Sequence, residues 1–197
     1  MVRFRHLMLF LATVAFVLPL SAATVIQMNL QQMVDRSDKI FRGTVLDARE
    51  GKVLAGGGEL PVITYRIRVE ESFKGTYNVV KGMQIAEIKM VGKLKPGPTT
   101  SSARSLSPLA DLPRLEVGKE YLLLTTPSSS IGLSTTVGLG QGRFSLQGKP
   151  GQEVAVNDNH NFGLFKGMPP SPTTSFPPEG PVPYQDLAGL IQELVGD

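Results

Sequence analysis

Arg66 and Arg68 are the first candidates for chemistry, because they stand two residues apart in a stretch that alternates between apolar and polar residues. Such alternation predicts a β-strand with one buried and one solvated face, and both guanidinium groups would lie on the solvated face. Arg42 and Lys89 belong to other predicted strands and are expected nearby. The four side chains predict a face that could bind an anionic ligand; an ordinary solvated sheet face is the alternative.

Two short runs are similar to ligand-binding loops but lack part of what those loops need. Residues 138–142 (GLGQG) space three glycines as nucleotide loops do, yet a strand is expected after them where a helix is needed. We therefore predict a hairpin or barrel bend. Residues 157–161 (NDNHN) alternate oxygen-bearing side chains as some calcium loops do. Asp158 is their only carboxylate, and Phe162 stands where the sharp-turn glycine is needed, so we predict a polar turn.

Groups suited to catalysis are scarce. The chain has no cysteine, which removes thiol catalysis and thiolate zinc sites, and only His160 follows the first 23 residues. Ser134 and the serines at 128–130 belong to no nucleophile motif. The neighbours Glu70 and Glu71 would point to opposite faces of a strand. We expect no catalytic residue, no cofactor and no metal.

The elements that must position these residues are mostly strands. Glycine-rich residues 50–60 are expected to form a hairpin loop, and Gly43 indicates a bulge or a close packing contact inside a strand. Apolar and β-branched runs predict the strands themselves at residues 39–48, 62–73, 84–91, 119–126, 131–137, 142–146 and 153–156.

A helix is expected at each end of the strand region. Asn29 can cap a short helix with Gln32 reaching back to it, and the apolar spacing over 187–195 predicts a C-terminal amphipathic helix. Pro- and Ser-rich residues 92–116 and 162–183 predict two long loops. The chain is therefore expected to be mainly β: a small OB-like closed or partly open barrel with a short N-terminal and a C-terminal helix.

Residues 1–23 have the pattern of a cleavable secretory signal peptide. Arg3 and Arg5 precede an uncharged apolar run over 7–20, and a triplet of small residues ends at Ala23. The run has 14 residues, whereas a bilayer core requires about 20. Cleavage after Ala23 is therefore predicted, with no stable membrane span left afterwards.

The remaining residues, 24–197, are expected to form one β-barrel domain. Cleavage removes two arginines and lowers the formal net charge from +3 to +1, which leaves no strong field for nucleic acid. Exported eukaryotic domains usually carry disulfides, so a chain without cysteine favours a bacterial source. The predicted location is periplasmic or extracellular.

Five segments stand in a fixed order along the chain: 33–38 (MVDRSD), 40–45 (IFRGTV), 64–75 (TYRIRVEESFKG), 117–124 (VGKEYLLL) and 137–144 (VGLGQGRF). Together they resemble a family of exported bacterial proteins of unknown function that we group with netrin-like and metalloproteinase-inhibitor-like barrels. The resemblance implies an OB-like barrel in an exported protein. Metalloproteinase inhibitors place an N-terminal cysteine on the zinc of their target, and that mechanism cannot be transferred to a chain without cysteine.

These observations favour a non-enzymatic exported binding or interaction domain, whose partner is another exported protein or an anionic ligand. Two alternatives stay open. The first is a secreted protease inhibitor that presents a loop such as 92–116 to its target. The second is a glycan hydrolase that uses only carboxylates and needs two of them about 5–10 Å apart in a cleft.

Overall fold

One antiparallel sheet of eight strands forms the body of the protein, in the order β3-β4-β2-β1-β5-β6-β7-β8. The computed structural model describes residues 26–92, 114–169 and 176–196; the predicted signal peptide and most of the first predicted loop lie outside them. A mainly β architecture with two helices is confirmed, and the sheet is not closed. The strands are β1 (Lys39–Ala55), β2 (Gly58–Lys74), β3 (Asn78–Val80), β4 (Met83–Val91), β5 (Glu120–Thr125), β6 (Arg143–Gln147), β7 (Val154–Asn157) and β8 (Val182–Pro183).

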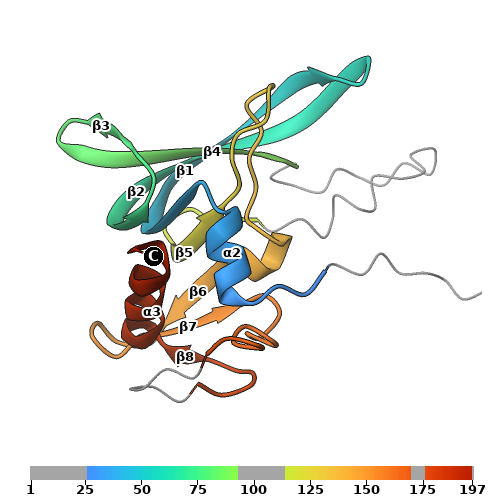
Figure 1. Cartoon of the computed structure of the whole chain (residues 1–197). Coiled ribbons are helices and arrows are strands. Elements are labelled where there is room, and N and C mark those ends of the chain that lie inside the picture. The colour runs from blue at the N-terminus through green and yellow to red at the C-terminus, as the bar shows by residue number, and fades with distance from the viewer. Residues whose placement is uncertain (1–25, 93–113, 170–175, 197) are drawn as a thin grey trace, which may run out of the picture.

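Strands β1 and β2 form a long hairpin that projects from the body (Figure 1). The expectation of a loop over 50–60 is wrong, because pairing continues to Ala55 opposite Gly58. The turn consists only of Gly56 and Gly57, with φ of 59° and 79°. Two consecutive left-handed residues suit the twist of a tight hairpin, so the glycines that indicate a loop instead permit two long strands to join.

Gly43 is both a bulge position and a close contact, as predicted. The β1–β2 register shifts between Arg42 and Gly43. A Cβ atom at Gly43 would lie 2.5 Å from the Arg68 carbonyl oxygen and 2.8 Å from a methyl group of Ile67. The first of these neighbours is backbone and cannot move aside without disturbing the ladder.

We therefore expect Gly43→Ala to lower the free energy of unfolding by about 1–3 kcal/mol, the usual range for overpacking. Gly51→Ala is the matched control in the same strand, because its Cβ would meet only Val62, at an ordinary 3.6 Å. Urea denaturation of both variants measures the difference. If both substitutions lowered the free energy of unfolding equally, the close contact between Gly43 and the Arg68 carbonyl would not be the cause.

The helices cover one face of the sheet and carry the first hydrophobic core. In α2 (Leu30–Arg36) the capping box is confirmed: Asn29 Oδ1 accepts from Gln32 N at 2.9 Å, and Asn29 N donates to Gln32 Oε1 at 3.1 Å. The predicted apolar face of α3 (Tyr184–Gly196) packs into the same core. Its fully buried members include Leu30, Met33, Ile40, Leu122, Leu124, Phe144, Leu187 and Ile191.

The opposite face of β1, β2, β4 and β5 carries a second core. Ile63, Tyr65 and Ile67 alternate into it from β2, as their spacing predicts. β5 is central, and its residues 121–125 are all buried, also as expected. Burial of each large side chain contributes about 1.5–3 kcal/mol, so both faces of β1 and β5 contribute to stability.

The segment after β5 doubles back on itself and does not form the strand expected at 131–137. Thr126 N donates to Thr135 O at 2.8 Å, and Ser129 N donates to Leu133 O at 2.7 Å. We call residues 126–135 the seam turn, because Ser134 N donates to Lys89 O at 2.9 Å and so joins it to β4 (Figure 1). The 3-10 helix η2 (Leu139–Gly142) then follows where a bend was expected.

Candidate functional site

The structure places all four predicted ligand-face residues on one face of the sheet. Arg66 and Arg68 alternate with the buried residues of β2, and Lys89 lies opposite Thr64 on β4. Arg42 lies opposite Leu122, on the face that α3 covers at one end. The prediction of a shared face is therefore supported by the register.

Arg66 and Arg68 are already paired with carboxylates. Arg66 contacts Asp47 at 3.2 Å, and Arg68 contacts Glu70 at 2.9 Å. Their charges are balanced by neighbours on the sheet, which weakens their pull on an anion. An anionic ligand here stays a prediction.

Lys89 differs from the three arginines. Its side chain is half-buried, and within the described ranges no ion pair or hydrogen bond engages its ammonium group. Lys89 Nζ lies 3.9 Å from the position that a Cβ of Gly132 would take, so it sits against the seam turn. Lys89 is therefore the predicted ligand-face residue whose charge is still available.

Arg42 is the centre of a charge cluster with two carboxylates. Its Nε donates to Glu120 Oε1 at 2.7 Å and its Nη2 to Glu120 Oε2 at 3.1 Å, a bidentate pair. The same Nη2 donates to Glu153 Oε1 at 3.1 Å. The guanidinium lies 4.6 Å from the ring centre of Tyr184, whose hydroxyl donates to Glu71. Arg42 thus joins β1 and β5 to the start of α3.

The charges in this cluster stabilise each other. The hydrogen bond to Glu120 raises the pKa of Arg42 despite partial burial. Burial raises the pKa of Tyr184, with Glu71 adding to the rise. The pKa of Glu153 is lowered by its own backbone N–H and by Arg42. A glycosidase general acid needs a raised carboxyl pKa, so Glu153 is not suited to that role.

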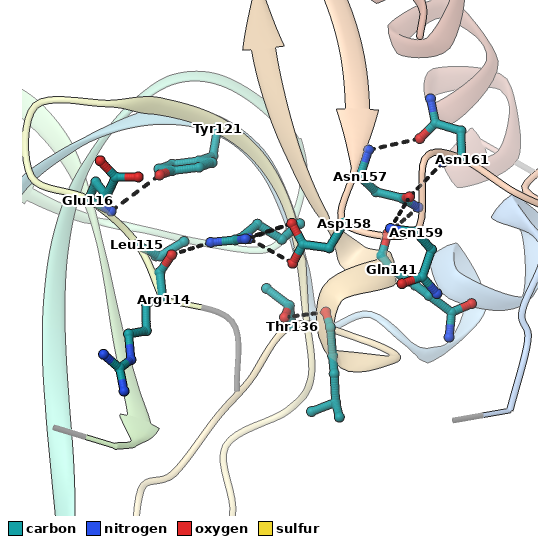
Figure 2. Close-up of polar contacts among 12 residues, drawn as sticks. Arg114, Leu115, Glu116, Tyr121, Thr136, Gln141, Asn157, Asp158, Asn159 and Asn161 are labelled. Carbon is teal, nitrogen blue, oxygen red and sulfur yellow. Dashed lines mark hydrogen bonds and ion pairs between the residues drawn. The ribbon is translucent and has the colours of Figure 1, made fainter. Parts of the chain in front are cut away.

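The NDNHN run forms a hydrogen-bonded turn that is anchored by the buried side chains of Asn157 and Asn161 (Figure 2). Asn157 Oδ1 accepts from the backbone N–H groups of Asn159, at 3.0 Å, and Asn161, at 2.8 Å. Asn161 has φ of 59° and donates to the carbonyls of Ala155 and Gly180 at 2.9 and 2.8 Å. These amides hold backbone groups together, which agrees with the polar turn predicted from the sequence.

The GLGQG run meets that turn and fixes the N-terminal end of the described chain. Asn157 Nδ2 donates to Gln141 O at 3.0 Å. The buried Gln141 side chain accepts from Met28 N at 2.9 Å and donates to Ile26 O at 2.9 Å. The GLGQG and NDNHN runs therefore form one hydrogen-bonded structural unit.

Arg143 closes the same region toward the second core through Asp158, which Figure 2 labels. It forms a forked ion pair with Asp158, with the shortest contact at 2.6 Å, and donates to the carbonyl of Arg114. Its guanidinium lies 5.9 Å from the ring centre of Tyr121. Leu115 N donates to the hydroxyl oxygen of buried Tyr65, and burial raises the pKa of that hydroxyl. These contacts fix the chain that leads into β5.

A pocket of about 370 Å³ lies between the end of β4 and the seam turn. We call it the seam pocket. Leu139, one of its lining residues, holds φ of 57°, and Thr136 fixes it through Leu139 N at 3.0 Å and Leu139 O at 2.6 Å. Such a conformation is costly for a branched residue and is often found at binding sites. The apolar lining consists of Met90, Val91, Pro127, Leu133 and Leu139, and the hydroxyl lining of Thr126, Ser129, Ser134 and Thr135.

The pocket was not predicted from the sequence, because residues 131–137 were expected to form a strand. The proline at 127, the serines at 128–130 and Gly132 are a turn signature that could have located the seam turn. The pairing of that turn with β4 is a long-range contact, and no local pattern indicates it.

Within the described ranges, no three His, Asp or Glu side chains gather closely enough to hold a metal ion. Of the helices that the structure describes, none reaches the length and apolar character of a membrane span. No model of a known protein family matches the chain, and no curated protein matches it.

Proposed function

We propose that this protein is an exported, non-enzymatic binding domain that takes a small, mainly apolar ligand in the seam pocket. The observation that carries the proposal is the pocket itself, about 370 Å³ in volume and lined largely by apolar side chains. Ligand sites typically fall within about 300–1,000 Å³ and combine an apolar lining with a few polar groups. The pattern of residues 1–23 supports export.

An OB-like, partly open barrel is also part of the proposal. Strands β4, β2, β1 and β5 are consecutive in the sheet, and their shared face carries the second core. The seam turn approaches β4 through the Ser134–Lys89 hydrogen bond, where a closing pairing would be needed. Mouths and seams of small barrels are common ligand sites, so the barrel and the pocket support each other.

The test is a titration of the isotope-labelled, purified protein with 1-octanol, followed by backbone amide shifts. We expect saturable shifts in residues that surround the seam pocket, with a Kd on the order of 1 mM for so small a ligand. Leu133→Asp places a charge in the pocket and should abolish binding. Ile131→Asp is the matched control, because Ile131 is exposed on the same turn and does not line the pocket.

Binding that survives Leu133→Asp, or shifts scattered over the whole surface, would contradict a specific pocket. The fold of each variant is checked by its amide spectrum before titration, since both substitutions lie on a partly exposed turn.

A further inference from the structure

We propose that the ligand of the seam pocket is an aliphatic carboxylic acid of medium length, whose carboxylate pairs with Lys89. This inference rests on the proposed function and adds the chemical class of the ligand. It combines the apolar lining, the hydrogen bonds of the lining hydroxyls and the position of one unengaged ammonium group.

The lining is mainly apolar, and three of its four hydroxyl groups each form a hydrogen bond within the seam turn. Thr126 Oγ1 accepts from Thr135 N at 3.1 Å, and Ser129 Oγ accepts from Leu133 N at 3.0 Å. Ser134 Oγ donates to Thr126 O at 2.9 Å. Thr135 Oγ1 is shielded from solvent and has no hydrogen-bond partner within the described part of the chain. A peptide or sugar would bury several polar groups without partners, so an aliphatic chain fits better.

Lys89 provides charge at the margin of the pocket. Lys89 and the lining residue Val91 are two positions apart on β4, so their side chains lie on the same face. Lys89 Nζ is beside Gly132, within the seam turn that forms the other wall. A half-buried ammonium group next to an apolar pocket favours a ligand with an apolar chain and an anionic end.

The volume sets the length of that chain. At about 30 Å³ for each water-sized group, 370 Å³ holds roughly a dozen non-hydrogen atoms. At that packing, an acid of about eight to ten carbons fills the pocket. Longer chains would have to leave through its open side.

The experiment compares sodium octanoate with 1-octanol at neutral pH on the same amide signals. In the unchanged protein we expect octanoate to bind about five- to tenfold more tightly than octanol, the usual effect of one partly shielded charged hydrogen bond. Lys89→Met should remove that preference by weakening octanoate binding to the level of octanol binding. Lys81→Met is the matched control on the exposed β3–β4 turn and should retain the preference.

The possible outcomes separate the two proposals. Binding of neither compound overturns the proposed function, and the inference with it. Equal binding of both, or a preference that survives Lys89→Met, overturns only the inference. Octylammonium that binds as tightly as octanoate overturns it as well. If the protein attaches to phosphatidylglycerol vesicles but does not bind free octanoate, the ammonium group of Lys89 serves contact with a membrane surface. That result would also overturn the inference.

Discussion

Replacing Arg42 with methionine is expected to lower the free energy of unfolding by about 3 kcal/mol, a large share of the stability of a domain this size. The Arg42 side chain is 18% exposed and binds both Glu120 and Glu153, and the latter is 13% exposed. Methionine keeps the volume but leaves both carboxylates without their cation. Breaking one partner of a shielded pair costs more than the pair itself contributes.

Arg68→Met is the matched control, because Arg68 is 46% exposed and has one partner, Glu70. Arg68→Met should lower the free energy of unfolding by less than about 1 kcal/mol. The Arg42 effect should also depend on pH. The pKa of Glu153 is lowered in the folded state, so its contribution is present above its ordinary pKa of 4.5 and is lost as the pH falls through the lowered value.

Guanidinium denaturation of the unchanged protein and both variants, at neutral and at acidic pH, measures these differences in the free energy of unfolding. The gap between the unchanged protein and Arg42→Met should narrow in acid. A gap that stays constant with pH, or an Arg68→Met effect of equal size, would show that the carboxylates are not the cause.

Asn161→Ala is the second substitution with a large expected effect. It should lower the free energy of unfolding by about 3–4 kcal/mol. Asn161 is buried and left-handed, and its side chain bonds the backbone of Asn157, Ala155 and Gly180. Alanine leaves three shielded backbone groups without partners, each costing about 1–3 kcal/mol before relaxation and water entry. It also loses the tolerance of asparagine for positive φ.

Asn159→Ala is its natural control within the same five-residue run. Asn159 is exposed, and its hydrogen bond to Asn157 uses its backbone N–H, so removing its side chain should lower the free energy of unfolding by about 0.5 kcal/mol or less. Thermal unfolding by circular dichroism should separate the two variants by many degrees. Similar melting temperatures would mean that the run is an ordinary surface turn.

Local patterns predicted the elements whose determinants are local. Alternation over 62–73 identified most of β2, because one face of that strand is buried and the other is solvated. The capping box at Asn29 was predictable because its two hydrogen bonds span three residues. The apolar spacing of 187–195 identified α3 for the same reason.

Long-range pairing could not be predicted in this way. Arg42 meets Glu153 across 111 positions, and Gln141 meets Met28 across 113. Such contacts depend on the register of several strands at once. The anion-binding face was predicted from basic residues alone, and the acidic partners that balance Arg66 and Arg68 become visible only when β1 and β2 are aligned.

The open sheet has a consequence for self-association. Its two edge strands in the described structure, β3 and β8, have three and two residues, and Pro183 in β8 has no backbone N–H to donate. A long unpaired edge can template another chain, and edges as short as β3 and β8 offer few unpaired groups for this. Within the described residues, the longer exposed edge is the part of β1 beyond Val45, which pairs with β2 alone, so strand-mediated self-association would start at the projecting hairpin.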